Sequence, residues 1–136
     1  MKVVMIEDNL GDILLTQDTF EELGIDIDLT TFNDGESGMR YFKELSKKNL
    51  SKNSPDLVIL DINLPQKTGI EILQFIRNEI SDPNFKVVFL TSSNANQDVR
   101  EIKRLNADAH FLKPLDSDEF LEFYEKMKDE AFRIKQ

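Results

Sequence analysis

The amino-acid sequence predicts an α/β protein with a doubly wound, fully parallel sheet made of five strand–helix units. Residues 3–6, 57–60 and 87–90 are apolar runs without a polar position, which is typical of strands buried on both faces. These runs alternate with stretches that carry apolar residues at helical spacing. No repeat, linker or low-complexity segment interrupts the alternation, so we expect a single domain over residues 1–136.

The first half of the chain contains two of these units and a loop. Residues 3–6 form the first strand, and Gly24 ends the helix that follows it. The apolar face of that helix is predicted to be Leu10, Ile13, Leu14, Gln17, Phe20 and Leu23. Residues 27–32 alternate in polarity and predict a strand towards one edge, and Asp34 caps the next helix. That helix presents Met39, Phe42 and Leu45 on one face, and residues 47–55 form an exposed polar loop.

The second half contains the other three units. Residues 57–60, 87–90 and 110–112 are the predicted strands. The two helices between them carry their apolar residues at Ile70, Leu73 and Ile76, and at Val99, Ile102 and Leu105. Asp116 and Glu119 form a capping-box pattern for the last helix. The inner face of this helix is predicted to be Phe120, Tyr124, Met127 and Ala131.

The composition excludes several classes of function. The chain has 17 Lys and Arg against 26 Asp and Glu, a net charge of −9, which disfavours binding to nucleic acid. It has no cysteine, which excludes disulfides, thiolate zinc sites and a cysteine nucleophile. No apolar run approaches the roughly 18 residues needed to span a bilayer, and the N-terminus is too short to be a signal peptide. We therefore expect a soluble, cytoplasmic domain that binds neither nucleic acid nor membrane.

The residues that follow the strands are the candidate functional residues. In an open parallel sheet, the functional crevice lies beyond the carboxyl ends of the strands. The polar side chains expected at that edge are Glu7, Asp8, Asp61, Thr91 and Lys113. Each has a structural alternative when taken alone, as a turn or cap residue or as an acidic pair before a helix. Four strand ends with compatible chemistry favour a functional site.

These residues predict metal-assisted phosphoryl transfer. Three clustered carboxylates need a cation or a proton, and an all-oxygen ligand set selects Mg²⁺ or Mn²⁺. Lys113 and Thr91 are suited to binding phosphoryl oxygens. Asp61 can then act as a nucleophile that forms an aspartyl phosphate.

This set of residues closely resembles the receiver domain of two-component response regulators. The resemblance covers essentially the whole chain, and its most specific part is the segment 57–65 followed by Gly69. It implies a flavodoxin-like (βα)₅ fold with strand order 2-1-3-4-5. It also implies that Asp61 is the phosphoacceptor, supplied by a phosphohistidine on a sensor histidine kinase or a phosphotransfer protein.

The resemblance further assigns the metal ligands. Asp8 and Asp61 are expected to bind Mg²⁺ directly, together with the backbone carbonyl of Asn63. Glu7 occupies a position where many members have Asp, and its longer side chain is expected to act through a metal-bound water. The protein is then not a conventional enzyme, because it catalyses its own phosphorylation and dephosphorylation.

The remaining roles implied by the family concern phosphoryl binding and switching. Thr91 is expected to hydrogen-bond the acyl phosphate and Lys113 to form an ion pair with it, with a cis bond between Lys113 and Pro114. Thr91 and His110 are the expected switch residues. His110 stands where the family commonly has Tyr or Phe, and an exposed histidine at a strand end is the alternative interpretation.

Other features are similar to the stand-alone regulators that accompany bacterial phytochromes. They are the loop 47–55, the pair Asp8-Asn9 and the run 91–93. The chain ends about one helix after Pro114, so we expect no DNA-binding effector domain and an output through protein–protein contact. A homodimer through the last two strand–helix units is the expected form of that contact.

Three functions from other classes are alternatives to this interpretation. A flavodoxin-like electron carrier is disfavoured, since Glu7-Asp8 would repel a flavin phosphate. A haloacid-dehalogenase-type phosphatase needs a second Asp two positions after its nucleophile, where this chain has Asn63. The remaining alternative is a phosphorylation-independent pseudo-receiver that acts only as an interaction module.

Overall fold

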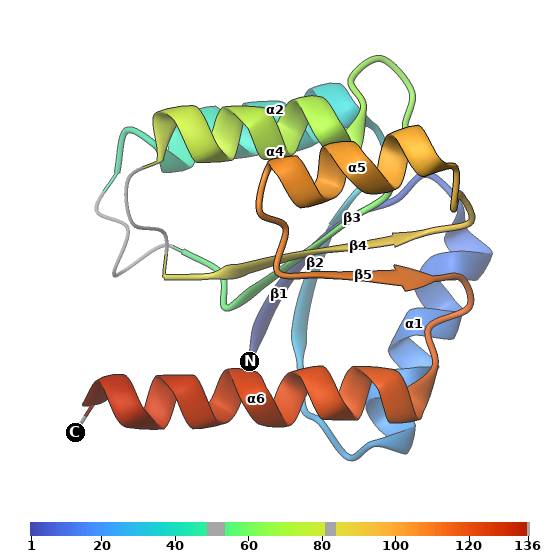
Figure 1. Ribbon diagram of the computed structural model, residues 1–136, viewed down its shortest axis with the longest axis vertical. Coiled ribbons are helices and arrows are strands. Elements are labelled where there is room, and N and C mark those ends of the chain that lie inside the picture. The colour runs from blue at the N-terminus through green and yellow to red at the C-terminus, as the bar shows by residue number, and fades with distance from the viewer. Residues whose placement is uncertain (49–53, 81–83, 136) are drawn as a thin grey trace.

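The computed structural model describes residues 1–48, 54–80 and 84–135, and it has a parallel sheet between two layers of helices (Figure 1). In chain order the elements are β1 (Lys2–Ile6), α1 (Leu10–Glu22), β2 (Asp28–Phe32), α2 (Gly35–Leu45), β3 (Leu57–Leu60), α4 (Gly69–Glu79), β4 (Lys86–Thr91), α5 (Asn96–Arg104), β5 (Ala109–Leu112) and α6 (Ser117–Lys135). The strand order is β2-β1-β3-β4-β5, and every neighbouring pair is parallel. The predicted fold class and strand order are confirmed. Most of the predicted loop 47–55 lies outside the described residues.

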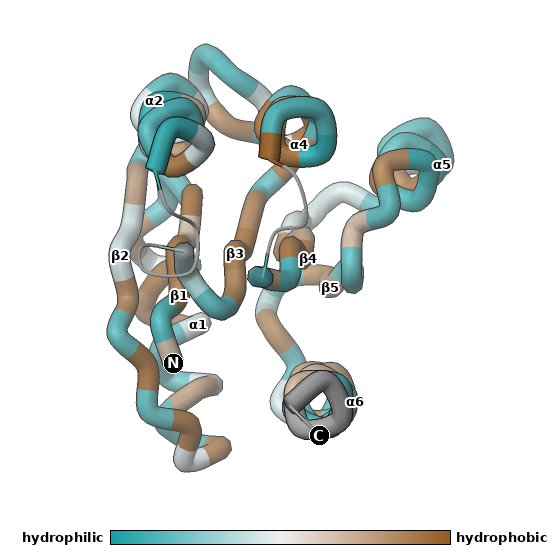
Figure 2. Tube along the Cα trace, turned by 90° about the vertical axis from the view of Figure 1, so that its left-hand side faces the viewer, coloured by the Kyte–Doolittle hydropathy of each residue, from teal (hydrophilic) through white to brown (hydrophobic). Residues whose placement is uncertain are grey.

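The helices divide between the two faces of the sheet. Helices α2, α4 and α5 cover one face, and α1 and α6 cover the other (Figures 1 and 2). Successive side chains of β3 alternate between two buried clusters: Val58 and Leu60 face α2 and α4, whereas Leu57 and Ile59 face α1 and α6. A strand covered on both sides must be apolar at every position, which explains the unbroken hydrophobic run in its sequence.

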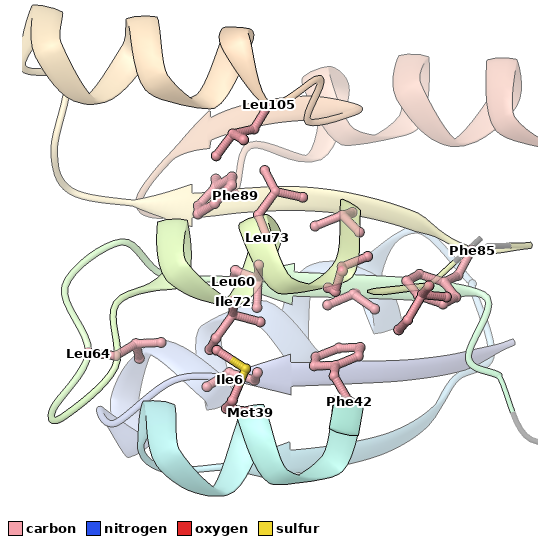
Figure 3. Packing of buried hydrophobic residues seen from close by; sticks show 14 of the residues in the cluster. Ile6, Met39, Phe42, Leu60, Leu64, Ile72, Leu73, Phe85, Phe89 and Leu105 are labelled. Atoms are coloured by element: carbon pink, nitrogen blue, oxygen red, sulfur yellow. The ribbon is translucent and has the colours of Figure 1, made fainter. Parts of the chain in front are cut away.

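The larger cluster lies under α2 and α4 (Figure 3). Met39, Phe42 and Leu45 of α2 are buried there, as the helical spacing predicts. Ile72, Leu73 and Ile76 of α4 are fully buried against the same face of the sheet. The second cluster combines aliphatic side chains with Phe20, Phe111 and Phe120, and the ring centroids of Phe20 and Phe120 lie 4.9 Å apart, nearly edge to face. This contact joins α1 to α6.

The helix boundaries follow the predicted capping signals. The Asp34 side chain accepts a hydrogen bond from the Ser37 N–H at 2.7 Å. Gly24 has φ +69°, a left-handed conformation that glycine adopts without strain just after a helix. The Asp116 carboxylate accepts a hydrogen bond from the Glu119 N–H at 2.9 Å, so Asp116 caps α6.

The predicted apolar face of α1 is partly wrong. Leu10 is 68% exposed and Leu14 is 51% exposed. The buried side chains of α1 are Thr16, Thr19 and Phe20. The two threonines are tolerated there because each hydroxyl donates a hydrogen bond to a main-chain carbonyl oxygen within the helix. The buried face of α1 is set by its contacts with α6 and the turn before it, which are Phe20 against Phe120 and the Thr19 hydroxyl on Leu115 O, so the leucines lie on the outer side.

The predicted inner face of α6 extends too far. Phe120 is fully buried and Tyr124 packs against the second cluster, but Ala131 is exposed. A helix of 19 residues is about 28 Å long, whereas a strand of four residues spans about 13 Å. The end of α6 therefore runs past the sheet, as Figure 1 shows. No helix in the described ranges is long and apolar enough to cross a membrane.

The orientation of α1 can be tested by two substitutions on that helix. We expect Phe20→Ala to lower the free energy of unfolding by about 3–5 kcal/mol, because it leaves a cavity beside Phe120. Leu14→Ala, which removes an exposed side chain, should change it by less than about 0.5 kcal/mol. Urea unfolding followed by circular dichroism measures both. A larger loss for Leu14→Ala than for Phe20→Ala would contradict the assigned buried face.

Candidate functional site

The candidate site lies at the carboxyl ends of β1, β3, β4 and β5, and the sheet's hydrogen bonds hold three of its residues. Each of these residues donates its backbone N–H to the neighbouring strand one position beyond the regular ladder. Glu7 N–H donates to Phe32 O at 2.9 Å, Asp61 N–H to Ile6 O at 3.4 Å, and Lys113 N–H to Thr91 O at 3.0 Å. The side chains therefore converge because the parallel register aligns the ends of the strands.

Three predicted ligands lie together at this edge. Glu7, Asp8 and Asp61 each offer a carboxylate oxygen, and these oxygens all lie within 4.8 Å of one another. Glu7 is 1% exposed and Asp61 is 5% exposed, while Asp8 faces solvent. Glu7 Oε1 is buried without an aligned hydrogen bond, and the cation beside it is the Lys113 ammonium, whose Nζ lies 2.6 Å away. The donor set is all oxygen and open to solvent on one side, so it fits a divalent metal site.

Asn63 lies beside this group through its backbone. Its N–H donates to Asp61 Oδ1 at 3.2 Å, and its side chain is exposed. This contact fixes the loop after β3 next to the carboxylates. The role of the Asn63 carbonyl as a metal ligand stays a prediction, as does the water-mediated role of Glu7.

Lys113 supplies the positive charge of the site. Its Nζ lies 2.6 Å from Glu7 Oε1, without the alignment of a hydrogen bond, and it donates hydrogen bonds of 2.8 Å to Asp61 Oδ2 and Asp12 Oδ2. The peptide bond between Lys113 and Pro114 is cis, as the family resemblance implied. The lysine therefore bridges residues from β1, α1 and β3 at the end of β5.

The charges at the site shift the ionisation of two groups. Burial raises the pKa of the Glu7 carboxyl to about 7 against the opposing effect of Lys113, and the charge of Asp61 adds to the rise. Burial alone would lower the pKa of Lys113, but its contacts with Asp12, Asp61 and Glu7 outweigh this effect. The pKa of Lys113 consequently lies above the usual lysine range, and the ammonium stays charged.

Sequence reasoning missed Asp12. This residue stands in the first turn of α1, which begins at the same edge of the sheet. That helix begins right after its N-cap Asn9, so an acidic residue in its first turn lies close to Glu7 and Asp8, and this is the signal that would have placed Asp12 near the site. Asp12 does not follow a strand, so the pattern of strand ends does not include it.

The two predicted switch residues, Thr91 and His110, lie on the neighbouring strands β4 and β5. Thr91 is fully buried, and its Oγ1 accepts a hydrogen bond from the Ser93 N–H at 3.3 Å. The Ser93 hydroxyl donates to Asp98 Oδ2 in α5 at 2.7 Å. His110 is half-buried beside Phe89 in the sheet, and its Nε2 is buried without a hydrogen-bond partner. A switching role for either residue stays a prediction.

Gly69 is required by the close approach of α4 to the candidate nucleophile. A Cβ at this position would collide with the main-chain oxygen of Asp61. The Gly69 N–H donates to Ile62 O at 3.2 Å and closes the loop that follows Asp61. The glycine thus allows α4 to begin directly behind the site.

A flavodoxin-like domain with acidic residues and a lysine at the carboxyl ends of its strands defines a receiver-type protein. Comparison of the chain with known protein families agrees with this class. The family model described as "Response regulator receiver domain" matches residues 3–125, so the chain belongs to this family. It is a receiver domain of two-component response regulators.

Similar proteins include a phosphotransferase and response regulators. Sporulation initiation phosphotransferase F of Bacillus subtilis is 31% identical over 125 residues, which covers 92% of this chain and 91% of that protein. The solved structure of "Bacteriophytochrome response regulator RtBRR" superposes with a TM-score of 0.73 at 25% identity, covering 93% of this chain and 76% of that chain.

Response regulator Rcp1 of Synechocystis is similar in both sequence and structure. It is 30% identical over 111 residues, which covers 82% of this chain and 75% of that protein. The crystal structure of its Mn²⁺-bound form superposes with a TM-score of 0.69 at 28% identity, covering 96% of this chain and 92% of that chain. A divalent metal in this neighbour agrees with the metal site inferred from the carboxylates.

Metal addition should stabilise the fold, since a cation relieves repulsion among the carboxylates. At Mg²⁺ ten times above its dissociation constant, we expect a gain of about 1.4 kcal/mol and a rise in Tm of roughly 3–8 °C relative to EDTA. Thermal unfolding measures this difference. Asp8→Asn, at an exposed ligand, should remove most of the rise. An equal rise in the variant would place the metal elsewhere.

Proposed function

We propose that Asp61 accepts a phosphoryl group from a phosphohistidine of a sensor histidine kinase or a phosphotransfer protein. The observation that carries this proposal is the position of the Asp61 carboxylate: it is nearly buried, it belongs to the metal-binding group, and its Oδ2 lies 2.8 Å from Lys113 Nζ. A carboxylate so placed can attack an electrophile, and it has a cation beside it to offset the charge of an incoming phosphoryl group.

In the proposed step, an Asp61 oxygen forms a bond to phosphorus while the bond from phosphorus to the donor's imidazole nitrogen breaks. The nitrogen keeps the electron pair of that bond, and because the other ring nitrogen of the phosphohistidine carries a proton, the donor is left as a neutral imidazole. Lys113 then pairs with the phosphoryl oxygens, and the Thr91 hydroxyl donates a hydrogen bond to one of them. The cycle is completed when water hydrolyses the acyl phosphate and releases inorganic phosphate.

We propose Mg²⁺ as the physiological ion, with Mn²⁺ able to replace it. The carboxylates of Glu7, Asp8 and Asp61, with the carbonyl of Asn63, would hold it. Such an ion neutralises charge between the phosphoryl oxygens and the carboxylates. The all-oxygen group and the Mn²⁺-bound neighbour support this assignment.

Asp61→Asn should abolish phosphorylation, because the amide is nearly isosteric with the carboxylate but is neither an anion nor a nucleophile. Incubation with Mg²⁺ and acetyl phosphate, followed by intact-protein mass spectrometry, gives the stoichiometry. Asp18→Asn, at an exposed position on α1, is the matched control and should retain wild-type labelling. Full labelling of the Asp61 variant would place the acceptor at another residue.

Lys113→Met should reduce the rate of labelling by about 10²-fold or more, since the phosphoryl oxygens lose their cationic partner. The methionine keeps an unbranched side chain of similar length up to Cε and removes the ammonium, with its charge and its N–H donors. Labelling time courses at saturating Mg²⁺ separate this effect from metal affinity. A wild-type rate in the folded variant would show that the lysine is structural.

A phosphorylation-independent pseudo-receiver is the second candidate. It predicts no labelling of wild-type protein by any phosphodonor and partner binding that survives Asp61→Asn. The presence of the acceptor, the lysine and the buried threonine around one group of carboxylates supports the phosphorylated receiver instead.

The output surface is proposed to be α5, β5 and α6. Capture of the Thr91 hydroxyl by a phosphoryl group would break its contact with Ser93, which is itself bonded to Asp98 of α5. His110 would then move towards the space left by Thr91. Leu112 of the edge strand β5 is 47% exposed and lies on this surface. Output passes through protein–protein contact there, and the bacteriophytochrome neighbour supports a phytochrome-type kinase as the input partner.

A homodimer through this surface should be strengthened by phosphorylation. Sedimentation at physiological salt, with Mg²⁺ and with or without beryllofluoride, measures its population. Leu112→Asp should weaken the dimer, because it places charge in the interface of two acidic chains. A monomer under all conditions would exclude the dimer and leave the receiver function intact.

A further inference from the structure

Lys113 has one carboxylate partner that does not belong to the metal-binding group. Glu7 and Asp61, its partners at 2.6 and 2.8 Å, are both among the three carboxylates that can hold a cation. Asp12, whose Oδ2 lies 2.8 Å from the same Nζ, is outside that group. The ammonium has three N–H groups, so it can keep Asp12 as a partner while its other two N–H groups serve different acceptors.

The position of Asp12 is fixed by hydrogen bonds of its own backbone. Its N–H donates to Asn9 Oδ1 at 3.0 Å, which is the N-cap contact of α1. Its carbonyl oxygen accepts a hydrogen bond from Thr16 Oγ1 at 2.8 Å, and Thr16 is buried. The side chain is 29% exposed and lies in the first turn of the helix, where negative charge is favourable. The backbone of Asp12 is therefore held in place, with its carboxylate next to Lys113.

A divalent cation creates a conflict for Lys113. A bound ion would compete with Lys113 for the carboxylates of Glu7 and Asp61, and its positive charge would repel the ammonium. The contacts of Lys113 with these two residues would then weaken at the stage when a phosphoryl group needs its charge.

We propose that Asp12 is a positioning residue that holds the Lys113 ammonium beside Asp61 while a divalent cation is bound. This inference rests on the proposed function. Asp12 touches neither the metal-binding group nor the phosphoryl group in this arrangement, and it acts through the lysine. It pre-organises the cation that the phosphoryl group meets on Asp61.

The sign of the change in anion affinity distinguishes a positioning role for Asp12 from the effect of a simple surface charge. Removing a negative charge near the site should tighten the binding of an anion if Asp12 acts only through space. Removing the anchor of Lys113 should weaken the binding of the same anion. The two roles therefore predict opposite signs for Asp12→Asn.

The experiment titrates beryllofluoride, an anionic phosphoryl analogue, into the whole 136-residue chain at saturating Mg²⁺ and follows the bound species by ¹⁹F NMR. We expect Asp12→Asn to weaken binding by about tenfold. Asp18→Asn removes the same charge from the exposed side of α1 and should change affinity by less than about twofold at physiological salt. Circular dichroism confirms that each variant is folded.

A Lys113→Met background completes the test. If Asp12 acts through the lysine, Asp12→Asn no longer weakens binding there, so the two substitutions are strongly coupled. Unchanged or tighter binding by Asp12→Asn alone, or an equal loss in both backgrounds, would overturn the role of Asp12. Failure of wild-type protein to bind beryllofluoride with Mg²⁺ would overturn the proposed function itself, which is a different outcome.

Discussion

The need to compensate clustered negative charge at one edge of the sheet governs this molecule. Glu7 is almost fully buried, yet it lies beside Asp8 and Asp61, and burial raises its pKa to about 7. An uncompensated carboxylate pair in such a place would be costly, and Lys113 supplies the compensating charge within the described structure. The same imbalance makes the site receptive to a divalent cation. Charge compensation therefore connects the stability of the fold to the chemistry of the site.

The parallel sheet is what brings these charges together. Each of Glu7, Asp61 and Lys113 extends the ladder by one backbone hydrogen bond, so the rigid strands set the distances among their side chains. Gly69 lets α4 approach the main chain of Asp61, and the buried residues of α4 anchor it on the sheet. The surrounding hydrophobic clusters thus hold the polar site in place without taking part in its chemistry.

A series of hydrogen bonds connects the site to α5. Lys113, which contacts Asp61, donates its backbone N–H to Thr91 O, and Ser93 joins Thr91 to Asp98 of α5. In the adjoining strand β5, the buried Nε2 of His110 lacks a hydrogen-bond partner, which is unfavourable for a polar atom away from water. The proposed switch would act through these contacts, because a phosphoryl group that takes the Thr91 hydroxyl would change the surroundings of Ser93 and Asp98.

The sequence by itself determined the strands, the strand–helix alternation and the residues at the carboxyl ends, because unbroken apolar runs and capping residues are local signals. Asp61, Thr91 and Lys113 could be placed at one edge from these signals, since parallel strands end on the same side. The tertiary structure decided the rest. It turned Leu10 and Leu14 of α1 outwards and buried two threonines, because contacts with α6 and the turn before it fixed the rotation of the helix. It also brought Asp12 to Lys113, across 101 positions of the chain, through a contact that depends on how α1 lies against the end of β5 and that no local pattern encodes.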